Sequence, residues 1–272
     1  MDGDGTAKRT YETVTVDEEM HQQKEKTLGP EHPETLAARG DVAFTYWSNG
    51  RFDEAIEIEE EVLADSERIL GPDAPGTLVA RSNLASSYSS AGRTDEAITL
   101  EQQVLADSER VLGPDHETTV TARANLAMSY WAADRREEAI ALQEEVVASA
   151  ERVARIDDDD DLVTARDQLV ESYWAQGMTE KAIELEETAL AAMEDLEGPD
   201  DLAVMDARAT LASSYRMAGR ADEAKALQKR LIGDLSRIIG PNHPATVAAV
   251  RTFINSDGGT AEAAAVDGGG SA

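Results

Sequence analysis

The feature that most constrains the fold of this chain is a sequence unit that recurs about every 42 residues. Leu28-Gly29-Pro30 returns as Leu70-Gly71-Pro72 and as Leu112-Gly113-Pro114, and the heptapeptide VLADSER occurs at 62–68 and again at 104–110. The pair Ala38-Arg39 recurs at 80, 122, 165 and 207, so one residue is inserted before the fourth copy. Tandem units of this size are typical of repeat proteins, in which each unit buries its apolar face against its neighbours.

Each copy of the unit predicts two helices. In the second copy, apolar residues from Leu78 to Tyr88 recur at helical spacing, and Gly92 follows them. Glycine after a helix can adopt the left-handed conformation that a closing turn requires. A second helix is expected to start near Asp95 and to stop at Pro114, because proline lacks the amide hydrogen and clashes with the preceding turn.

The sequence therefore predicts an all-α chain, a right-handed α-solenoid of tandem helical hairpins. Its predicted parts are a disordered N-terminus at 1–10, a degenerate half-repeat helix at 11–27, hairpins at 28–69, 70–111, 112–153, 154–196 and 197–238, a capping helix at 239–255 and a disordered tail at 256–272. The fourth hairpin has the acidic run Asp157–Asp161 where the other copies have a Gly-Pro loop.

Composition and charge narrow the classes of partner. The chain has 55 acidic against 25 basic residues, a formal net charge of −30, and no cysteine. Such a surface repels nucleic acids and anionic membranes and favours basic partners, although it also serves simply to keep a long array soluble. No leader and no long apolar run is evident, so we expect a cytoplasmic protein without a membrane segment.

No pattern for catalysis is found, and we predict neither an enzyme nor a bound metal or cofactor. Phosphate-binding G-x-x-x-x-G-K-[ST] loops and G-x-S-x-G elbows are absent. His32, His116 and His243 fall in equivalent loops of separate copies, so they are not expected to converge on a metal. A calcium loop counted from Asp157 fails because Leu162 stands where glycine is needed.

The residues from Arg81 to Tyr88, followed by Ala97, resemble the tetratricopeptide repeat. The 42-residue period and the GPxHP-like loops at 29–33 and 240–244 are similar to the kinesin light chain subclass of that family. Two departures are that Arg81 replaces a tryptophan and Glu101 a phenylalanine of the motif. The resemblance implies a non-catalytic scaffold or adaptor that binds proteins or peptides.

The resemblance also implies that one stripe of each first helix lines a concave groove. All three tryptophans lie at one register of this stripe, and flat aromatic side chains are frequent hot spots of binding. The alternative is that each ring only seals the contact between neighbouring hairpins. The residues expected to form the binding groove are Asp41, Phe44, Trp47, Asn83, Ser86, Asn125, Met128, Trp131, Gln168, Glu171, Trp174 and Arg216.

One row of this set is polar: Asp41, Asn83, Asn125, Gln168 and Thr210 stand at equivalent positions of the five copies. An amide both donates and accepts, so it can bracket an extended peptide backbone, as asparagine often does in kinesin light chain-like arrays. The alternative is that these side chains bond only to neighbouring helices. The repeated arginines, such as Arg81, are expected to pair structurally with repeated acids instead of clamping an acidic ligand.

The predicted function is thus protein or peptide binding, with a basic partner favoured and with a monomer or weak self-association. Two other functions stay open. The chain could act as a sensor module beside a separate signalling ATPase or transcription regulator, or it could self-assemble as a structural array.

Overall fold

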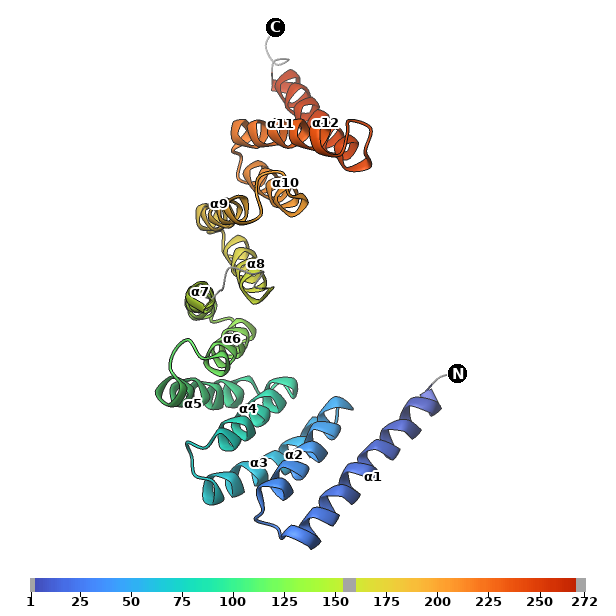
Figure 1. Cartoon of the computed structure of the whole chain (residues 1–272), viewed down its shortest axis with the longest axis vertical. Helices are drawn as coiled ribbons and strands as arrows, with labels where there is room; N and C mark the ends of the chain where they lie inside the picture. Colours follow the sequence, from blue (N-terminus) through green and yellow to red (C-terminus); the bar gives the residue numbers. More distant parts are fainter. Residues whose placement is uncertain (1–2, 154–159, 268–272) are drawn as a thin grey trace. The chain divides into compact units, whose positions relative to one another are not determined.

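The computed structural model describes the backbone of residues 3–153 and 160–267 and the side chains of 16–153 and 161–255. Over these ranges the chain consists of helices joined by short loops, and no strand occurs in them. The chain divides into two compact units, Met1–Ala154 and Arg155–Ala272. The prediction of an all-α chain of consecutive hairpins is confirmed (Figure 1).

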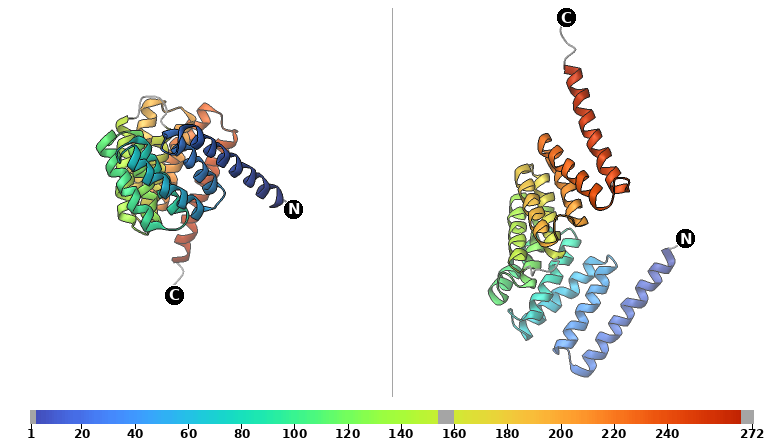
Figure 2. Two further views of the ribbon diagram at one scale, coloured as in Figure 1. Left: turned by 90° about the horizontal axis from the view of Figure 1, so that it is seen from below. Right: turned by 45° about the horizontal axis from the view of Figure 1, so that its top comes forward.

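The first unit contains a long helix and three hairpins, in which each helix packs against the next one along the chain. Figure 2 shows the same succession from two further directions. The helices are α1 (Gly3–Leu28), α2 (Pro33–Ser48), α3 (Phe52–Ile69), α4 (Pro75–Ser90), α5 (Thr94–Leu112), α6 (Glu117–Ala132) and α7 (Arg136–Val153).

The second unit contains two hairpins and a last helix, again packed in sequence order. Its helices are α8 (Asp160–Ala175), α9 (Thr179–Leu196), α10 (Leu202–Met217), α11 (Ala221–Ile238) and α12 (Pro244–Asp267). In both units we call α2, α4, α6, α8 and α10 the first helices, because each opens a hairpin.

The turn inside each hairpin needs a residue with positive φ. Gly50, Gly92, Gly177 and Gly219 fill this place with φ between 68° and 76°, and Asp134 fills it in the third hairpin with φ 62°. Asp134 is the one non-glycine residue with positive φ in the described part of the chain. An L-residue is strained there, so the third hairpin closes at a cost that its neighbours avoid.

The loop between hairpins is held by a buried threonine. Gly71 has φ 94°, and its carbonyl oxygen accepts a hydrogen bond of 2.7 Å from the Thr77 hydroxyl, six residues on. Thr35 and Thr246 make the same bond to Gly29 and Gly240 at 2.8 and 2.9 Å. Each of the three threonines is at most 1% exposed.

The loop histidines cap the helices that follow them. The Nδ1 atoms of His32 and His116 each accept a hydrogen bond of 3.2 Å from the main-chain amide two residues later. His243 does the same at 3.3 Å. A side chain that accepts from a free amide of the first turn stabilises the helix start. The three histidines therefore have a structural role in separate loops.

Within the first unit the apolar core runs from one hairpin into the next. One cluster joins Ile56 of α3, Leu84 and Tyr88 of α4 and Ala97 of α5, and all four are at most 9% exposed. A second cluster joins Ile98 of α5 to α6 and α7 in the same way. Since both of these clusters draw on two hairpins, a single hairpin would leave part of its apolar face uncovered.

Buried arginines reinforce the same junctions. Arg81 of α4 is 4% exposed, and it donates to Glu67 of the preceding hairpin at 2.8 Å and to Asp107 of its own hairpin at 2.7 Å. Arg208 is fully buried between Glu194 and Asp234 in the equivalent arrangement. The expected structural role of these arginines is confirmed. The acid on the following helix is an aspartate for Arg81 and Arg208, whereas Arg123 pairs at 3.0 Å with the expected glutamate, Glu145, and all three also pair with a glutamate of the preceding hairpin.

The ends of the chain differ from expectation. Disorder was predicted for 1–10 and 256–272, yet α1 begins at Gly3 and α12 extends to Asp267. Alanine is the strongest helix former, and the segment from Ala261 to Ala265 is alanine-rich, which favours continuation of α12. Residues 1–2 and 268–272, and the acidic run as far as residue 159, lie outside the described backbone.

Candidate functional site

The predicted groove residues all lie on first helices, and they divide between the two units. Eight belong to the first unit: Asp41, Phe44 and Trp47 on α2, Asn83 and Ser86 on α4, and Asn125, Met128 and Trp131 on α6. Four belong to the second unit: Gln168, Glu171 and Trp174 on α8, and Arg216 on α10. We call the side of each unit that carries these residues its first-helix face.

Two large apolar side chains stand out on the first-helix face of the first unit. Phe44 and Met128 are each 60% exposed, although helices of this length normally turn such residues inward. The Phe44 ring stacks on that of Trp47, with centroids 5.7 Å apart and an interplanar angle of 23°. Exposed apolar side chains next to one another are typical of surfaces that bind other molecules.

Trp47 also connects two hairpins. It is half-buried, and its Nε1 donates a hydrogen bond of 2.9 Å to the Ser90 hydroxyl at the end of α4. This bond fixes the indole, and through the stacking contact it also restricts the Phe44 ring. A contact surface that is already ordered loses less entropy on binding.

The other two tryptophans are more deeply involved in packing. Trp131 packs against the cluster of Ile98, Leu126 and Tyr130, and the Arg136 guanidinium lies 4.1 Å above its ring. Trp174 packs against a cluster that includes Val204 and Leu211 of the following hairpin. Both indoles are half-buried. Each therefore seals a contact between helices, and only part of each ring can meet a ligand.

The polar row is free of partners in the first unit. Asp41 and Asn83 are exposed and Asn125 is half-exposed. Among the described residues none of these three side chains takes part in a hydrogen bond or an ion pair, so they do not bond to neighbouring helices. Ser86 differs, since its hydroxyl donates to the Ser82 carbonyl at 3.0 Å. The row therefore offers donors and acceptors to a ligand.

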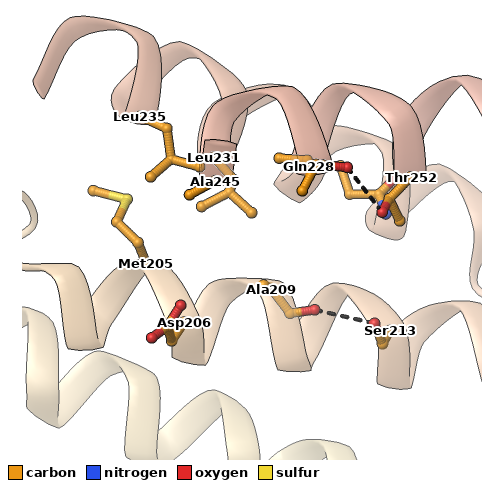
Figure 3. A pocket seen from close by; sticks show the side chains of 11 residues that line it. Met205, Asp206, Ala209, Ser213, Gln228, Leu231, Leu235, Ala245 and Thr252 are labelled. Carbon is orange, nitrogen blue, oxygen red and sulfur yellow. Dashed lines mark hydrogen bonds between the residues drawn. The ribbon is translucent and has the colours of Figure 1, made fainter. Parts of the chain in front are cut away.

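The second unit presents polar side chains and a cavity. Gln168, Glu171 and Arg216 are exposed, and the Arg216 guanidinium donates to the Ser213 hydroxyl at 3.3 Å. A cavity of about 320 Å³ lies beside α10. Its lining residues are Met205, Asp206, Ala209 and Ser213 of α10, Gln228, Leu231 and Leu235 of α11, and Ala245, Ala248, Ala249 and Thr252 of α12 (Figure 3).

The sequence did not single out this cavity, but a signal for it exists. Ala209 and Ser213 occupy the positions that Gly40 and Phe44 hold on α2, and α12 contributes three alanines. Small side chains at face positions leave space that larger ones fill. The walls of the cavity are mostly apolar and include the carboxylate of Asp206. Such a lining suits a ligand in which an apolar side chain stands next to a basic group.

Two classes of site are missing from the described residues. Within 16–153 and 161–255 no three histidine, aspartate or glutamate side chains are grouped so as to hold a metal ion. Among the helices described, none has the length and apolar character needed to cross a membrane.

Comparison with known proteins gives this arrangement a context. The model of the family described as "Tetratricopeptide repeat" matches residues 42–109, 102–152 and 161–233. No significant match exists among curated proteins. The similar solved structures include nearly identical TPR-like repeats of a protein named as a kinesin light chain from Podospora anserina. Identity to it is 27%, over 76% of this chain and 97% of that one, with a TM-score of 0.61.

Two further solved structures share the fold at lower identity. BtubC (BKLC) from P. vanneervenii is 21% identical over 87% of this chain and 93% of its own, with a TM-score of 0.61. A Rap protein in complex with competence and sporulation factor is 14% identical over 94% of this chain and 72% of its own, with a TM-score of 0.52. The resemblance to kinesin light chain-like repeats that the sequence indicated is confirmed.

Proposed function

Because this chain belongs to the tetratricopeptide repeat family, we propose that its first-helix faces bind segments of other proteins without catalysing a reaction. The observation that carries the proposal is the ordered, exposed Phe44–Trp47 pair beside the unpartnered row of Asp41, Asn83 and Asn125. Apolar anchors give affinity, and neighbouring amides and carboxylates satisfy the backbone of an extended segment.

The partner favoured by charge is basic. A net charge of −30 attracts cationic segments and speeds their encounter with the face. Asp41 and Glu171 are exposed on the face itself. We place this binding in the cytoplasm, with the chain monomeric or weakly self-associating. The similar Rap protein was solved in complex with competence and sporulation factor. Binding of such a factor belongs to the class of function that we propose here.

The test uses a displayed library of random peptides, selected on the wild-type protein. Selected peptides are then measured by fluorescence anisotropy against Phe44→Ala/Met128→Ala, in which both exposed apolar side chains are truncated. We expect affinity to fall about 10-fold or more, since each anchor contributes on the order of 1 kcal/mol. The helical content should be unchanged because neither side chain is buried.

A matched control variant is Val111→Ala/Val153→Ala. These valines are 41% and 53% exposed but lie at the ends of second helices, away from the face. Equal losses in the two double variants would contradict the proposal. Measurement at high salt separates the two attractions: binding that disappears there in every variant is due to the acidic exterior and not to the face.

A second candidate function is that of a sensor module beside a separate signalling ATPase. The tetratricopeptide sensor of a STAND protein from Pyrococcus horikoshii has the same fold, at 15% identity and a TM-score of 0.56. Copurification of a nucleotide-binding protein that dissociates on ATP addition would favour this function. Self-assembly predicts instead a mass that rises with concentration in light scattering.

A further inference from the structure

One position on the second helix of every hairpin carries an acid or its amide. The residues are Glu59, Glu101, Gln143, Glu186 and Gln228, at intervals of 42 or 43 residues. Glu59, Glu101 and Gln228 are only 6%, 7% and 6% exposed. Carboxylates are seldom buried so deeply without a cation, because the charged form loses its hydration.

Each of the three glutamates lies at a junction between hairpins. The Glu186 carboxylate of α9 accepts a hydrogen bond of 2.8 Å from the Ser214 hydroxyl of α10, in the next hairpin. Glu59 faces Ser87 of α4 and Glu101 faces Ser129 of α6 at the equivalent junctions, although the Ser87 hydroxyl makes no hydrogen bond to the described residues. One oxygen of every carboxyl, Oε2, is buried and has no hydrogen-bond partner among the described residues.

The cations near Glu101 are committed elsewhere. On α4, Arg81 pairs with Glu67 and Asp107, and on α6, Arg123 pairs with Glu109. The two tyrosines that flank the junction are also engaged, since Tyr88 donates to Glu60 and the Tyr130 hydroxyl accepts from Gln102.

The surroundings of the other two glutamates are alike. Glu59 packs between α2, where Arg39 pairs with Asp65, and α4, where Arg81 is paired as above. The charged group of α8 that acts on Glu186 is Asp167, which disfavours ionisation, while Trp174 donates to it. On α10, Arg208 pairs with Glu194 and Asp234, and Tyr215 with Glu187.

These surroundings favour the neutral acid. Burial raises the pKa of Glu101 to about 7, and the Ser129 hydroxyl offsets only part of the rise. Burial likewise raises the pKa of Glu59 and of Glu186. The other two hairpins have Gln143 and Gln228 at this position. A protonated carboxyl and an amide have nearly the same shape, and both offer a donor and an acceptor, so the chain itself shows that a neutral group suits the place.

We propose that Glu59, Glu101 and Glu186 make the junctions between hairpins sensitive to protons. When the three carboxyls are protonated, adjacent hairpins pack closely, and when they ionise, the junctions loosen. Ser87 and Ser129 adjoin Ser86 and Met128 of the first-helix face, so the same change is transmitted to that face. The effect on stability stands apart from the proposed binding function, and either can fail without the other.

The sign of the pH dependence follows from linkage. A carboxyl whose pKa is higher in the folded than in the unfolded chain contributes stability that is complete below about pH 4.3 and is lost as the pH rises through the folded pKa. For Glu101 this loss spans the range from about pH 4.3 to about pH 7. Each pKa unit corresponds to a tenfold change, so Glu101 alone is expected to change the folding equilibrium by roughly several hundred-fold between the two limits.

The experiment compares urea unfolding at about pH 5.5 and about pH 8, followed by circular dichroism. The variant Glu59→Gln/Glu101→Gln/Glu186→Gln should unfold at a higher urea concentration than the wild type at both pH values, by a small margin at the lower pH and by a clearly larger one at the upper pH. A control is needed because the net charge of −30 makes general repulsion depend on pH as well. Glu57→Gln/Glu61→Gln/Glu184→Gln removes the same charge from exposed sites on α3 and α9.

A reverse substitution tests the same position in the opposite direction. Gln143→Glu should lower the urea midpoint only slightly at about pH 5.5 and clearly more at about pH 8. The proposal is overturned if the buried triple variant retains the pH dependence of the wild type, or if it matches the exposed control. It is also overturned if the carboxyl ¹³C signal of Glu101 titrates near the ordinary value of about 4.3.

Discussion

The first-helix faces of the two units differ in surface shape, although both units consist of the same type of helical hairpin. In the first unit Phe44 and Met128 project from α2 and α6, each 60% exposed. On α10 of the second unit the equivalent position holds Ser213, and the space beside it is a cavity of about 320 Å³. The same helical hairpin can thus present exposed apolar side chains in one unit and, where small side chains of α10 and α12 meet α11, a cavity in the other.

The largest difference in stability is expected between two arginines of the repeated row that differ in burial, one in each unit. Arg208 is fully buried with two carboxylates, whereas the equivalent Arg39 has a side chain 16% exposed and pairs with Asp65. Arg208→Ala should lower the unfolding free energy of the second unit by about 3 kcal/mol, because it removes a fully buried cation and leaves Glu194 and Asp234 only the partly exposed Arg230 and Arg237 as partners. Arg39→Ala should lower that of the first unit by about 1 kcal/mol.

Chemical denaturation followed by hydrogen exchange measures both values. Exchange reports which amides lose protection, so unfolding of α9–α11 can be distinguished from unfolding of α2–α4. A loss of unfolding free energy for Arg208→Ala as small as that for Arg39→Ala would show that the second unit does not depend on the pairing of Arg208.

Filling the cavity should abolish its capacity to take a partner's side chain. Ala248 lies in the wall of the cavity on α12, so Ala248→Leu places a larger group in the open space. Peptides selected on the wild type that contact this unit should bind about 10-fold more weakly, or roughly 1.4 kcal/mol. Isothermal titration calorimetry gives the comparison, with Ala191→Leu at an exposed site on α9 as the control.

A smaller change in unfolding free energy is expected at the strained turn of the third hairpin, and it should be confined to the first unit. Asp134 has φ 62° and a side chain that is 85% exposed. Asp134→Gly should raise the unfolding free energy by about 1 kcal/mol, since glycine adopts this conformation without strain. Gly92→Ala, at the equivalent turn, should lower it by a similar amount. Thermal melting of both variants tests the pair, and a stabilised Gly92→Ala protein would contradict the account.

The smallest effect is expected at the start of α4. Its N-cap residue is Ala74, which has no side-chain acceptor, whereas α6 starts with the capping residue His116. Ala74→Ser should therefore stabilise the first unit by about 0.5–1 kcal/mol, and His116→Ala should destabilise it by a comparable amount. Urea midpoints of the two variants check these values, and equal midpoints for all three proteins would remove the capping explanation.

Much of this fold could be read from the repeat itself. Signals such as Gly71-Pro72 and Gly92 mark the breaks between helices, and the structure has its helix ends there. Propensity and periodicity are local, so they locate helices well. The acidic run Asp157–Asp161, at which the fourth copy departs from the Gly-Pro loop of the others, follows closely on the division between Ala154 and Arg155. At the N-terminus the described backbone of α1 begins at Gly3, within the segment for which disorder was predicted.

The candidate site was less accessible to the sequence. The stripe and the polar row of the site could be assigned from the repeat spacing. The spacing did not show that Trp131 and Trp174 are half-buried against core clusters whereas the Phe44 side chain is exposed. Burial depends on which neighbouring side chain reaches across, such as Arg136 over Trp131. The cavity was missed for the same reason, because empty space is set jointly by α10, α11 and α12 and by no single stripe.

The threonine-to-glycine bond in the loops between hairpins has an evolutionary consequence. The Thr77 hydroxyl bonds to the Gly71 carbonyl, six residues earlier. The loop is therefore held by its own residues and needs only the helix ends of the hairpins on either side. A gene segment encoding 70–111 could therefore be duplicated or deleted in frame, although at the joint that follows it the Thr119 hydroxyl has no hydrogen-bond partner among the described residues. Selection can therefore lengthen or shorten such a chain by whole hairpins.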